Sequence, residues 1–143
     1  MKKFELTTDS IKGNGTILYR IKSLIDFGDV KAGDLGGYVE KEENLSQYDN
    51  AWVHGDACIY GNARVSGDAQ VYDNAQVYDN ACVYGDVWVS GDAQVHGDAQ
   101  VYGNARVCGN AQVYDNACVY GDVWVYGNAR VSGDAQVYDN AQV

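Results

Sequence analysis

The side chains that most often carry out acid–base or metal chemistry are scarce in this chain. Histidine, a general base near neutral pH and a common zinc ligand, occurs twice, as His54 and His96. Both stand at a position that Tyr or Ser fills elsewhere in the sequence. A metal site with three histidine ligands cannot be built from two histidines within one chain. We therefore interpret both as solvated corner residues and predict no metal and no catalytic histidine.

The four cysteines point to no chemistry either. They are Cys58, Cys82, Cys108 and Cys118, and none has a histidine beside it. The first ten residues, MKKFELTTDS, lack the apolar stretch of a secretory signal, and no apolar run approaches the roughly 20 residues that cross a bilayer. We therefore expect reduced thiols, a cytoplasmic location and no cofactor.

Aspartate is the one ionisable residue that is abundant. Residues 45–143 contain twelve Asp, three Arg and no Lys, whereas residues 1–44 contain seven Lys/Arg and eight Asp/Glu. The composition shift predicts two parts, an N-terminal segment 1–44 and an acidic body 45–143. A body of this charge is not expected to bind nucleic acid directly or an anionic membrane.

The acidic body is a repeat. From Tyr48 the chain reads in sixes, as in YDNAWV, HGDACI and YGNARV, for sixteen units without an insertion. The apolar fourth and sixth positions flank an outward fifth, which is the alternation of a strand. The second and third positions, Gly/Asp and Asp/Asn, are turn residues. Calcium-binding β-rolls use a nine-residue repeat instead, so we interpret the aspartates as solvated turns.

One unit cannot bury its own apolar side, so the units must stack as a parallel β-solenoid. The stretch YDNACVYGDVWV occurs at 78–89 and again at 114–125, and the three tryptophans are also spaced by 36 residues. This spacing allows coils of 18 or of 12 residues. We prefer 18, because a three-sided core can be filled by one Val and one Ala per side. Five such coils would span roughly 25 Å.

The frame Val-x-Gly/Asp-Asp/Asn-Ala-x resembles the hexapeptide repeat of left-handed β-helix proteins. SGDAQV, YGNARV and HGDAQV are most similar to uncharacterised bacterial and phage proteins, and LYRIKSLIDFGDVKAGDLGGYVEKEENLS resembles the segment before such repeats in prophage-encoded members. The resemblance implies an all-β, single-stranded, left-handed parallel β-helix. It brings no agreed activity with it.

Acyltransferases often share this fold, but they need a catalytic histidine and an acceptor loop. No loop interrupts the repeats of this chain, which argues against an acyltransferase. We keep an acyltransferase as one alternative and a purely structural or self-assembling element as another. We favour a non-enzymatic protein that binds a protein partner.

The candidate partner-binding residues lie on the outside of the coils. Three tryptophans and an arginine share one fifth-position column on the 18-residue interpretation, and Trp and Arg are enriched at binding hot spots. A self-stacking ladder is the other explanation for this column. Regularly spaced carboxylates also suggest a nucleic-acid mimic that inhibits a host DNA- or RNA-binding enzyme. The predicted residues are Trp52, Trp88, Arg106, Trp124, Asp68, Asp86 and Asp122.

The two ends of the repeat raise separate expectations. Residues 1–44 contain strand-like runs, which predict a small β cap over the first coil. The last repeat units contain no lysine and no proline to protect an open strand edge, which predicts a homodimer through the C-terminal coil. The predicted edge residues are Ala129, Val131, Ala135, Val137, Ala141 and Val143.

Overall fold

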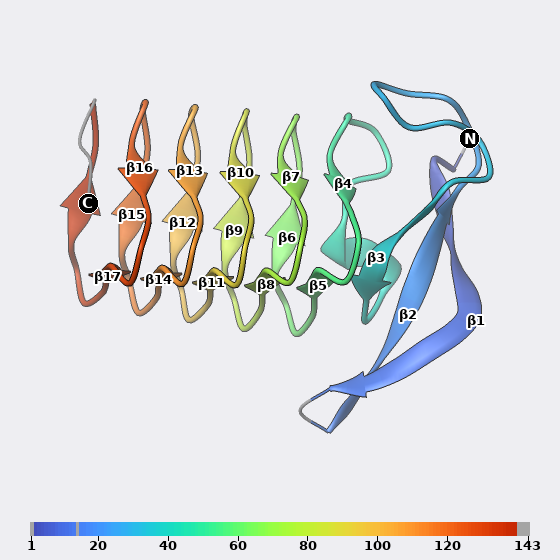
Figure 1. Ribbon diagram of the computed structural model, residues 1–143, viewed down its shortest axis with the longest axis horizontal. Coiled ribbons are helices and arrows are strands. Elements are labelled where there is room, and N and C mark those ends of the chain that lie inside the picture. Colours follow the sequence, from blue (N-terminus) through green and yellow to red (C-terminus); the bar gives the residue numbers. More distant parts are fainter. Residues whose placement is uncertain (1, 14, 140–143) are drawn as a thin grey trace.

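Residues 2–13 and 15–139 are described by a computed structural model, and in this part of the chain the strands form three sheets (Figure 1). Their orders are β1-β2-β3-β5-β8-β11-β14-β17, β16-β13-β10-β7-β4 and β18-β15-β12-β9-β6. From β4 onward, consecutive strands lie in different sheets, and neighbours in a sheet come from successive coils. The protein is therefore an all-β parallel β-solenoid, as the repeat predicts.

An antiparallel arrangement precedes the solenoid. Strands β1 (Phe4–Gly13) and β2 (Thr16–Ser23) form a hairpin, and β3 (Leu35–Val39) pairs antiparallel with β2. The other edge of β3 pairs in parallel with β5, so the hairpin continues one solenoid sheet. The short 3₁₀ helix η1 (Glu42–Asn44) leads into the first coil.

The solenoid strands are two residues long and recur every six residues, in three faces. The tryptophan face contains β4 (Trp52–Val53), β7 (Gln70–Val71), β10 (Trp88–Val89), β13 (Arg106–Val107) and β16 (Trp124–Val125). The second face contains β5 (Cys58–Ile59), β8 (Gln76–Val77), β11 (Gln94–Val95), β14 (Gln112–Val113) and β17 (Arg130–Val131). The third face contains β6 (Arg64–Val65), β9 (Cys82–Val83), β12 (Gln100–Val101), β15 (Cys118–Val119) and β18 (Gln136–Val137).

The register confirms the coil of 18 residues. Trp88 pairs with Gln70 on one side and with Arg106 on the other, each 18 positions away. Coil-to-coil hydrogen bonds fit this register, as in Tyr72 N–H to the carbonyl of Val89, which directly precedes the register partner of Tyr72, at 3.0 Å. A coil of 12 residues is thereby excluded.

The core is a column of alanine and valine side chains. Val101, in the middle of the solenoid, is fully buried, as are its neighbours Ala99 and Ala105. Each coil contributes only small side chains, so its burial alone does not offset the entropy of ordering the chain. Stability is therefore collective and depends on contact between neighbouring coils.

The turns explain the Gly/Asp choice at the second position. A Cβ built on Gly85 would lie 2.8 Å from the Gly103 carbonyl oxygen of the next coil, which favours glycine there. Asp73 adopts the same left-handed backbone, with φ of 63°, and its Oδ2 accepts a hydrogen bond from the Gly91 N–H at 3.1 Å. The same bond joins Asp79 to Gly97 and Asp115 to Gly133. Each of these aspartates thus makes a hydrogen bond to the next coil, which a glycine at the same position cannot make through a side chain.

The corner residues form aromatic ladders. Tyr84, Tyr102, Tyr120 and Tyr138 stack one above another with ring centroids 4.9 to 5.3 Å apart. This column is the one that the 18-residue coil predicts, and its spacing follows the distance between strands.

The N-terminal segment covers the first coil of the tryptophan face. Phe27, in the loop between β2 and β3, makes an edge-to-face contact with Trp52 at 5.3 Å, and Phe4 of β1 makes another at 6.2 Å. Lys3 is buried beside them, and its Nζ donates hydrogen bonds to the carbonyls of Asp49 at 2.8 Å and Ala51 at 2.7 Å. We use "the cap" for residues 2–44 without residue 14.

Candidate functional site

The tryptophan face presents one outward column with regular spacing. Its register runs from Trp52 through Gln70, Trp88 and Arg106 to Trp124. The Arg106 guanidinium carbon lies 4.7 Å from the ring centroid of Trp88 and 5.5 Å from that of Trp124. Arg106 therefore lies between two indoles, as the coil length predicts, and makes a cation–π contact with each.

The exposure of this column differs from the expectation in one residue. Trp88 is 42% exposed and Trp124 is 46% exposed, whereas Trp52 is 2% exposed. The expectation that Trp52 forms part of an open stripe is therefore wrong. Its side chain does point out of the coil, but Phe4 and Phe27 of the cap cover it. Only Trp88, Arg106 and Trp124 remain as a candidate surface.

The three candidate aspartates lie on the corner before the tryptophan face, and all are exposed. Asp68 and Asp86 are one coil apart, and neither carboxylate has a hydrogen-bond or ion-pair partner among the described residues. Asp122 accepts a hydrogen bond at 3.1 Å from the amide of Asn104, one coil earlier. Two adjacent, unpaired carboxylates thus stand where the cap meets the solenoid, and a single paired one stands further along.

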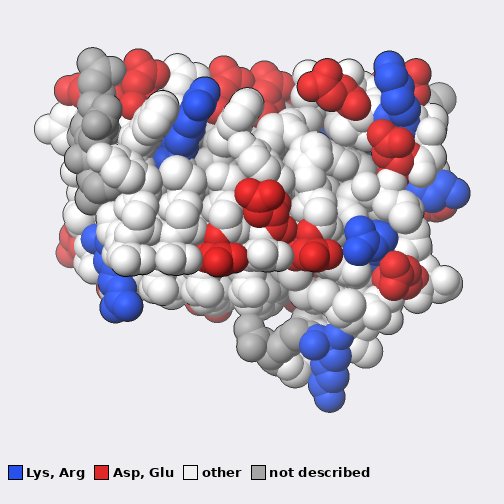
Figure 2. All heavy atoms as spheres, viewed as in Figure 1, with Lys and Arg blue, Asp and Glu red and all other residues white. Residues whose placement is uncertain are grey.

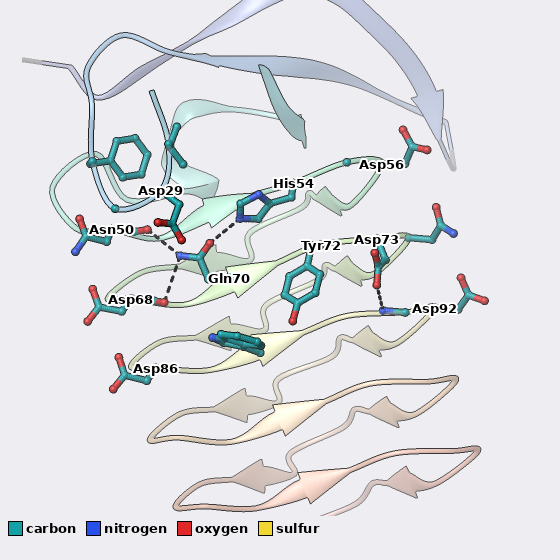
Figure 3. A pocket seen from close by; sticks show the side chains of 17 residues that line it. Asp29, Asn50, His54, Asp56, Asp68, Gln70, Tyr72, Asp73, Asp86 and Asp92 are labelled. Atoms are coloured by element: carbon teal, nitrogen blue, oxygen red, sulfur yellow. Dashed lines mark hydrogen bonds between the residues drawn. The ribbon is translucent and has the colours of Figure 1, made fainter. Parts of the chain in front are cut away.

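A groove of about 1110 Å³ opens beside these carboxylates, between the cap and Trp88. Figure 3 shows Asn50, Asp68 and Asp86 along one edge, Asp56 and Asp92 along the other, and His54, Gln70 and Tyr72 between them. The loop Phe27–Val30 closes the groove at the cap end. Sequence reasoning missed this groove, because the loop lies outside the repeat and no local pattern indicates where it packs.

Hydrogen bonds fix the floor of the groove. Gln70 donates from Nε2 to the Asn50 carbonyl at 3.0 Å, so its Oε1 is left to accept from His54 Nε2 at 2.6 Å. This bond places the proton of His54 on Nε2. The His54 ring also meets Tyr72 edge to face at 6.0 Å, and Tyr72 meets Trp88 in the same way at 5.8 Å. The floor is therefore an ordered polar and aromatic surface.

The groove is strongly acidic. Six aspartates line it, and no lysine or arginine is among its lining residues; the aspartates are Asp29, Asp56, Asp68, Asp73, Asp86 and Asp92. Two of them are partly engaged: Asp56 lies 3.8 Å from the Arg20 guanidinium, and Asp73 accepts the Gly91 N–H. The carboxylates of Asp29, Asp68, Asp86 and Asp92 have no hydrogen-bond or ion-pair partner in the described part of the chain. The groove consequently favours a positively charged ligand.

The other chemistry-bearing residues remain scattered. His96 stacks between Tyr78 at 4.7 Å and Tyr114 at 5.1 Å, on a different corner from His54. Burial lowers the pKa of His96 from its usual 6.5, and the carboxylates of Asp79 and Asp115 act in the opposite direction. The His96 ring is therefore one member of a stacked aromatic column with Tyr78 and Tyr114.

The cysteines are also apart. Gln100 separates Cys82 from Cys118 on the third face, and burial raises the pKa of Cys58 to about 11. Over residues 2–13 and 15–139, the structure contains no group of three His, Cys, Asp or Glu side chains that could hold a metal ion.

The predicted dimer edge is only partly described. Val131 is buried, Ala129 and Val137 are half-buried, and Ala135 is exposed. Ala141 and Val143 lie outside the described residues. The homodimer stays a prediction.

Comparison with known proteins identifies the family. A family model described as the YdcK beta solenoid repeat matches residues 57–73, 75–91, 99–112, 111–127 and 125–139. These matches cover just over half of the chain, which therefore belongs to the YdcK beta-solenoid repeat family. No curated protein matches the chain. Within the described ranges, no helix has the length and apolar character needed to pass through a membrane.

Proposed function

We propose that this protein is a non-enzymatic β-solenoid that binds a protein partner through its tryptophan face. The observation that supports this most is the exposed set Trp88, Arg106 and Trp124, which we call the Trp–Arg stripe. Two indoles remain close to half exposed although Arg106 covers part of each ring. Side chains of these types supply most of the binding energy in many protein interfaces.

The fold supports this function physically. The stripe lies on three neighbouring strands, β10, β13 and β16, so its side chains are held about 4.8 Å apart per coil. A surface that is ordered before binding loses little conformational entropy on association. Tyr126, next to β16, is also exposed and extends the apolar area.

Mimicry of nucleic acid is the narrower version of this proposal. It requires carboxylates that follow the path of a phosphate backbone. The solenoid places its aspartates on all three corners, and they form no continuous patch on the side shown in Figure 2. We therefore place the stripe, rather than the aspartates, at the centre of the proposed interface, and leave inhibition of a DNA- or RNA-binding enzyme as one outcome of the test.

The test is a capture experiment with the full chain and a bacterial lysate. The partner is identified by mass spectrometry, purified and titrated against Arg106→Ala and Trp124→Ala, each of which we expect to weaken binding at least tenfold. Gln100→Ala and Gln136→Ala, at outward positions of the third face, are the matched controls and should change the affinity less than twofold.

Several results would count against the proposal. Equal losses in both sets of variants would remove the stripe from the interface, and no specific partner at all would favour a purely structural element. A complex that salt dissociates and that DNA or RNA competes away would support mimicry.

A further inference from the structure

The groove between the cap and Trp88 is not accounted for by the Trp–Arg stripe. Its volume, about 1110 Å³, is that of a binding site rather than of a packing defect. It lies mostly along the tryptophan face, over Gln70, and is continuous with the stripe at Trp88. The charges and rings that line the groove indicate what it binds.

Four of the six carboxylates that line the groove are not paired with a basic side chain or a hydrogen-bond donor among the described residues. Asp68 and Asp86 lie on one edge and Asp92 on the other, while Asp29 reaches in from the cap loop (Figure 3). None of these four carboxylates has a hydrogen-bond or ion-pair partner among the described residues, and Asp68 and Asp86 repel each other across one coil step. A cation bound between the two edges would relieve that repulsion.

The tryptophan face already contains a model for how such a cation would sit. Arg106 lies between Trp88 and Trp124, with its guanidinium carbon 4.7 and 5.5 Å from their rings. The equivalent place one 36-residue repeat earlier, between Trp52 and Trp88, holds Gln70. Gln70 has no charge, and Phe27 packs on Trp52. Among the described residues, Trp88 therefore has no cation from the coil before it; its ring meets Tyr72 of that coil edge to face at 5.8 Å and lines the groove.

We propose that this groove binds an arginine-containing basic segment of a protein partner. One guanidinium stacks on the groove side of Trp88, opposite Arg106, and neighbouring basic residues pair with the carboxylates of Asp68 and Asp86 on one edge and Asp92 on the other. The planar guanidinium suits stacking and bidentate pairing better than the ammonium of lysine does. The inference rests on the proposed function in taking the partner to be a protein; groove and stripe share Trp88, and the other residues of the groove lie outside the stripe.

The test uses the full chain and a defined probe, the peptide acetyl-Arg-Gly-Arg-Gly-Arg-amide, followed by calorimetry and tryptophan fluorescence. We expect binding that weakens at least tenfold when citrulline, a neutral isostere, replaces each arginine. Replacement by lysine should weaken it about threefold or more. Spermine is the control for a small free cation and should bind more weakly than the arginine peptide.

Matched variants locate the site. Asp68→Asn together with Asp86→Asn should weaken binding at least tenfold, and the fold should survive because neither carboxylate is hydrogen-bonded or ion-paired within the described residues. Asp98→Asn together with Asp134→Asn makes the same charge change on another corner and should change binding less than twofold. Trp88→Leu should also weaken it at least tenfold.

Several outcomes of the peptide experiment would overturn the proposed groove site. Absence of binding at millimolar peptide, or equal losses in the two aspartate pairs, would overturn the proposal, since the second result means attraction to net charge alone. Spermine that binds as tightly as the peptide would reduce the site to a simple cation site and overturn it too. If the peptide does not bind while a captured partner is still lost on Trp124→Ala, this inference fails and the proposed function stands. If the peptide binds at the groove but no partner depends on the stripe, the reverse holds.

Discussion

Trp52 and Trp88 occupy the same position of the repeat, yet one is 2% exposed and the other 42%. Their strands, β4 and β10, have the same register within the tryptophan face, and both side chains point away from the core. The difference comes from Phe4 and Phe27, which pack on Trp52 from outside the repeat. The repeat thus decides the direction of a side chain, and residues outside the repeat decide whether it meets solvent.

The largest effect should come from the part of the molecule where all coils are alike. Val101→Asp places an unpaired charge in a fully buried column, which should lower the free energy of unfolding by at least about 4 kcal/mol. Chemical denaturation followed by circular dichroism measures this change. Gln100→Asp, at the adjacent outward position, is the control and should cost less than about 1 kcal/mol. Similar losses for both variants would mean that the assignment of inner and outer side chains is wrong.

The comparison of the two tryptophans can be measured directly. Trp52→Ala should destabilise the contact between cap and first coil by about 3 kcal/mol, because a buried indole is lost against Phe4 and Phe27. Trp88→Ala should change stability by less than about 1 kcal/mol. Hydrogen exchange of β1–β3 gives the readout. Equal protection in the two variants would show that the cap does not depend on Trp52.

Lys3 makes the same contact dependent on pH. Burial lowers the pKa of Lys3 from 10.5 to about 8, although its hydrogen bonds to backbone carbonyls favour the charged form. Between these values the unfolded chain holds more protons than the folded chain, so stability should rise with pH, by up to about 2 kcal/mol from pH 7 to 9.5. Denaturation at several pH values tests this. Lys3→Met should abolish the rise, and a rise that persists in this variant would assign it to another group.

The smallest effect distinguishes two aromatic ladders. His96 stacks between Tyr78 and Tyr114, whereas the ladder from Tyr84 to Tyr138 contains only tyrosine. Because burial lowers the pKa of His96, the unfolded chain binds a proton first on acidification. His96 therefore stabilises the fold above its usual pKa of 6.5, and this contribution is lost as the pH falls through the lower folded value.

His96→Tyr should remove that part of the acid sensitivity. The measurement is the difference in melting temperature between pH 7.5 and pH 5, which should be smaller in the variant than in the parent. The aspartates away from this corner are common to both proteins and cancel in this comparison, whereas Asp79 and Asp115, which act on the His96 ring, belong to the effect that is measured. An unchanged difference would mean that the ring of His96 titrates as it does in the unfolded chain.

Much of the fold could be predicted from the sequence because the solenoid is nearly one-dimensional. Each strand contacts equivalents one coil away, so a repeat in the sequence becomes a contact in space at a fixed step. The 18-residue coil, the burial of Val101 and the stacking of Tyr84 on Tyr102 all follow from that step. The same reasoning placed Arg106 between Trp88 and Trp124.

In the turns, the sequence pattern is clear, but charge repulsion explains only part of it. Pairs such as Asp73-Asn74 avoid adjacent carboxylates, which repulsion explains. The structure adds that the Asp73 carboxylate binds the Gly91 N–H one coil on, so the residue that follows in the next coil matters as much as the neighbour in the chain.

The sequence by itself determined the solenoid, its period and the outward direction of the Trp–Arg stripe, because these depend only on contacts that repeat every 18 residues. The tertiary structure alone decided that Trp52 is buried and that a groove forms over Gln70. Both result from the cap, whose Phe4 and loop 27–30 pack against the first coils through contacts that occur once and have no period. A contact made once leaves no pattern in a single sequence, and its position is set by packing, which depends on the whole surface that the cap meets.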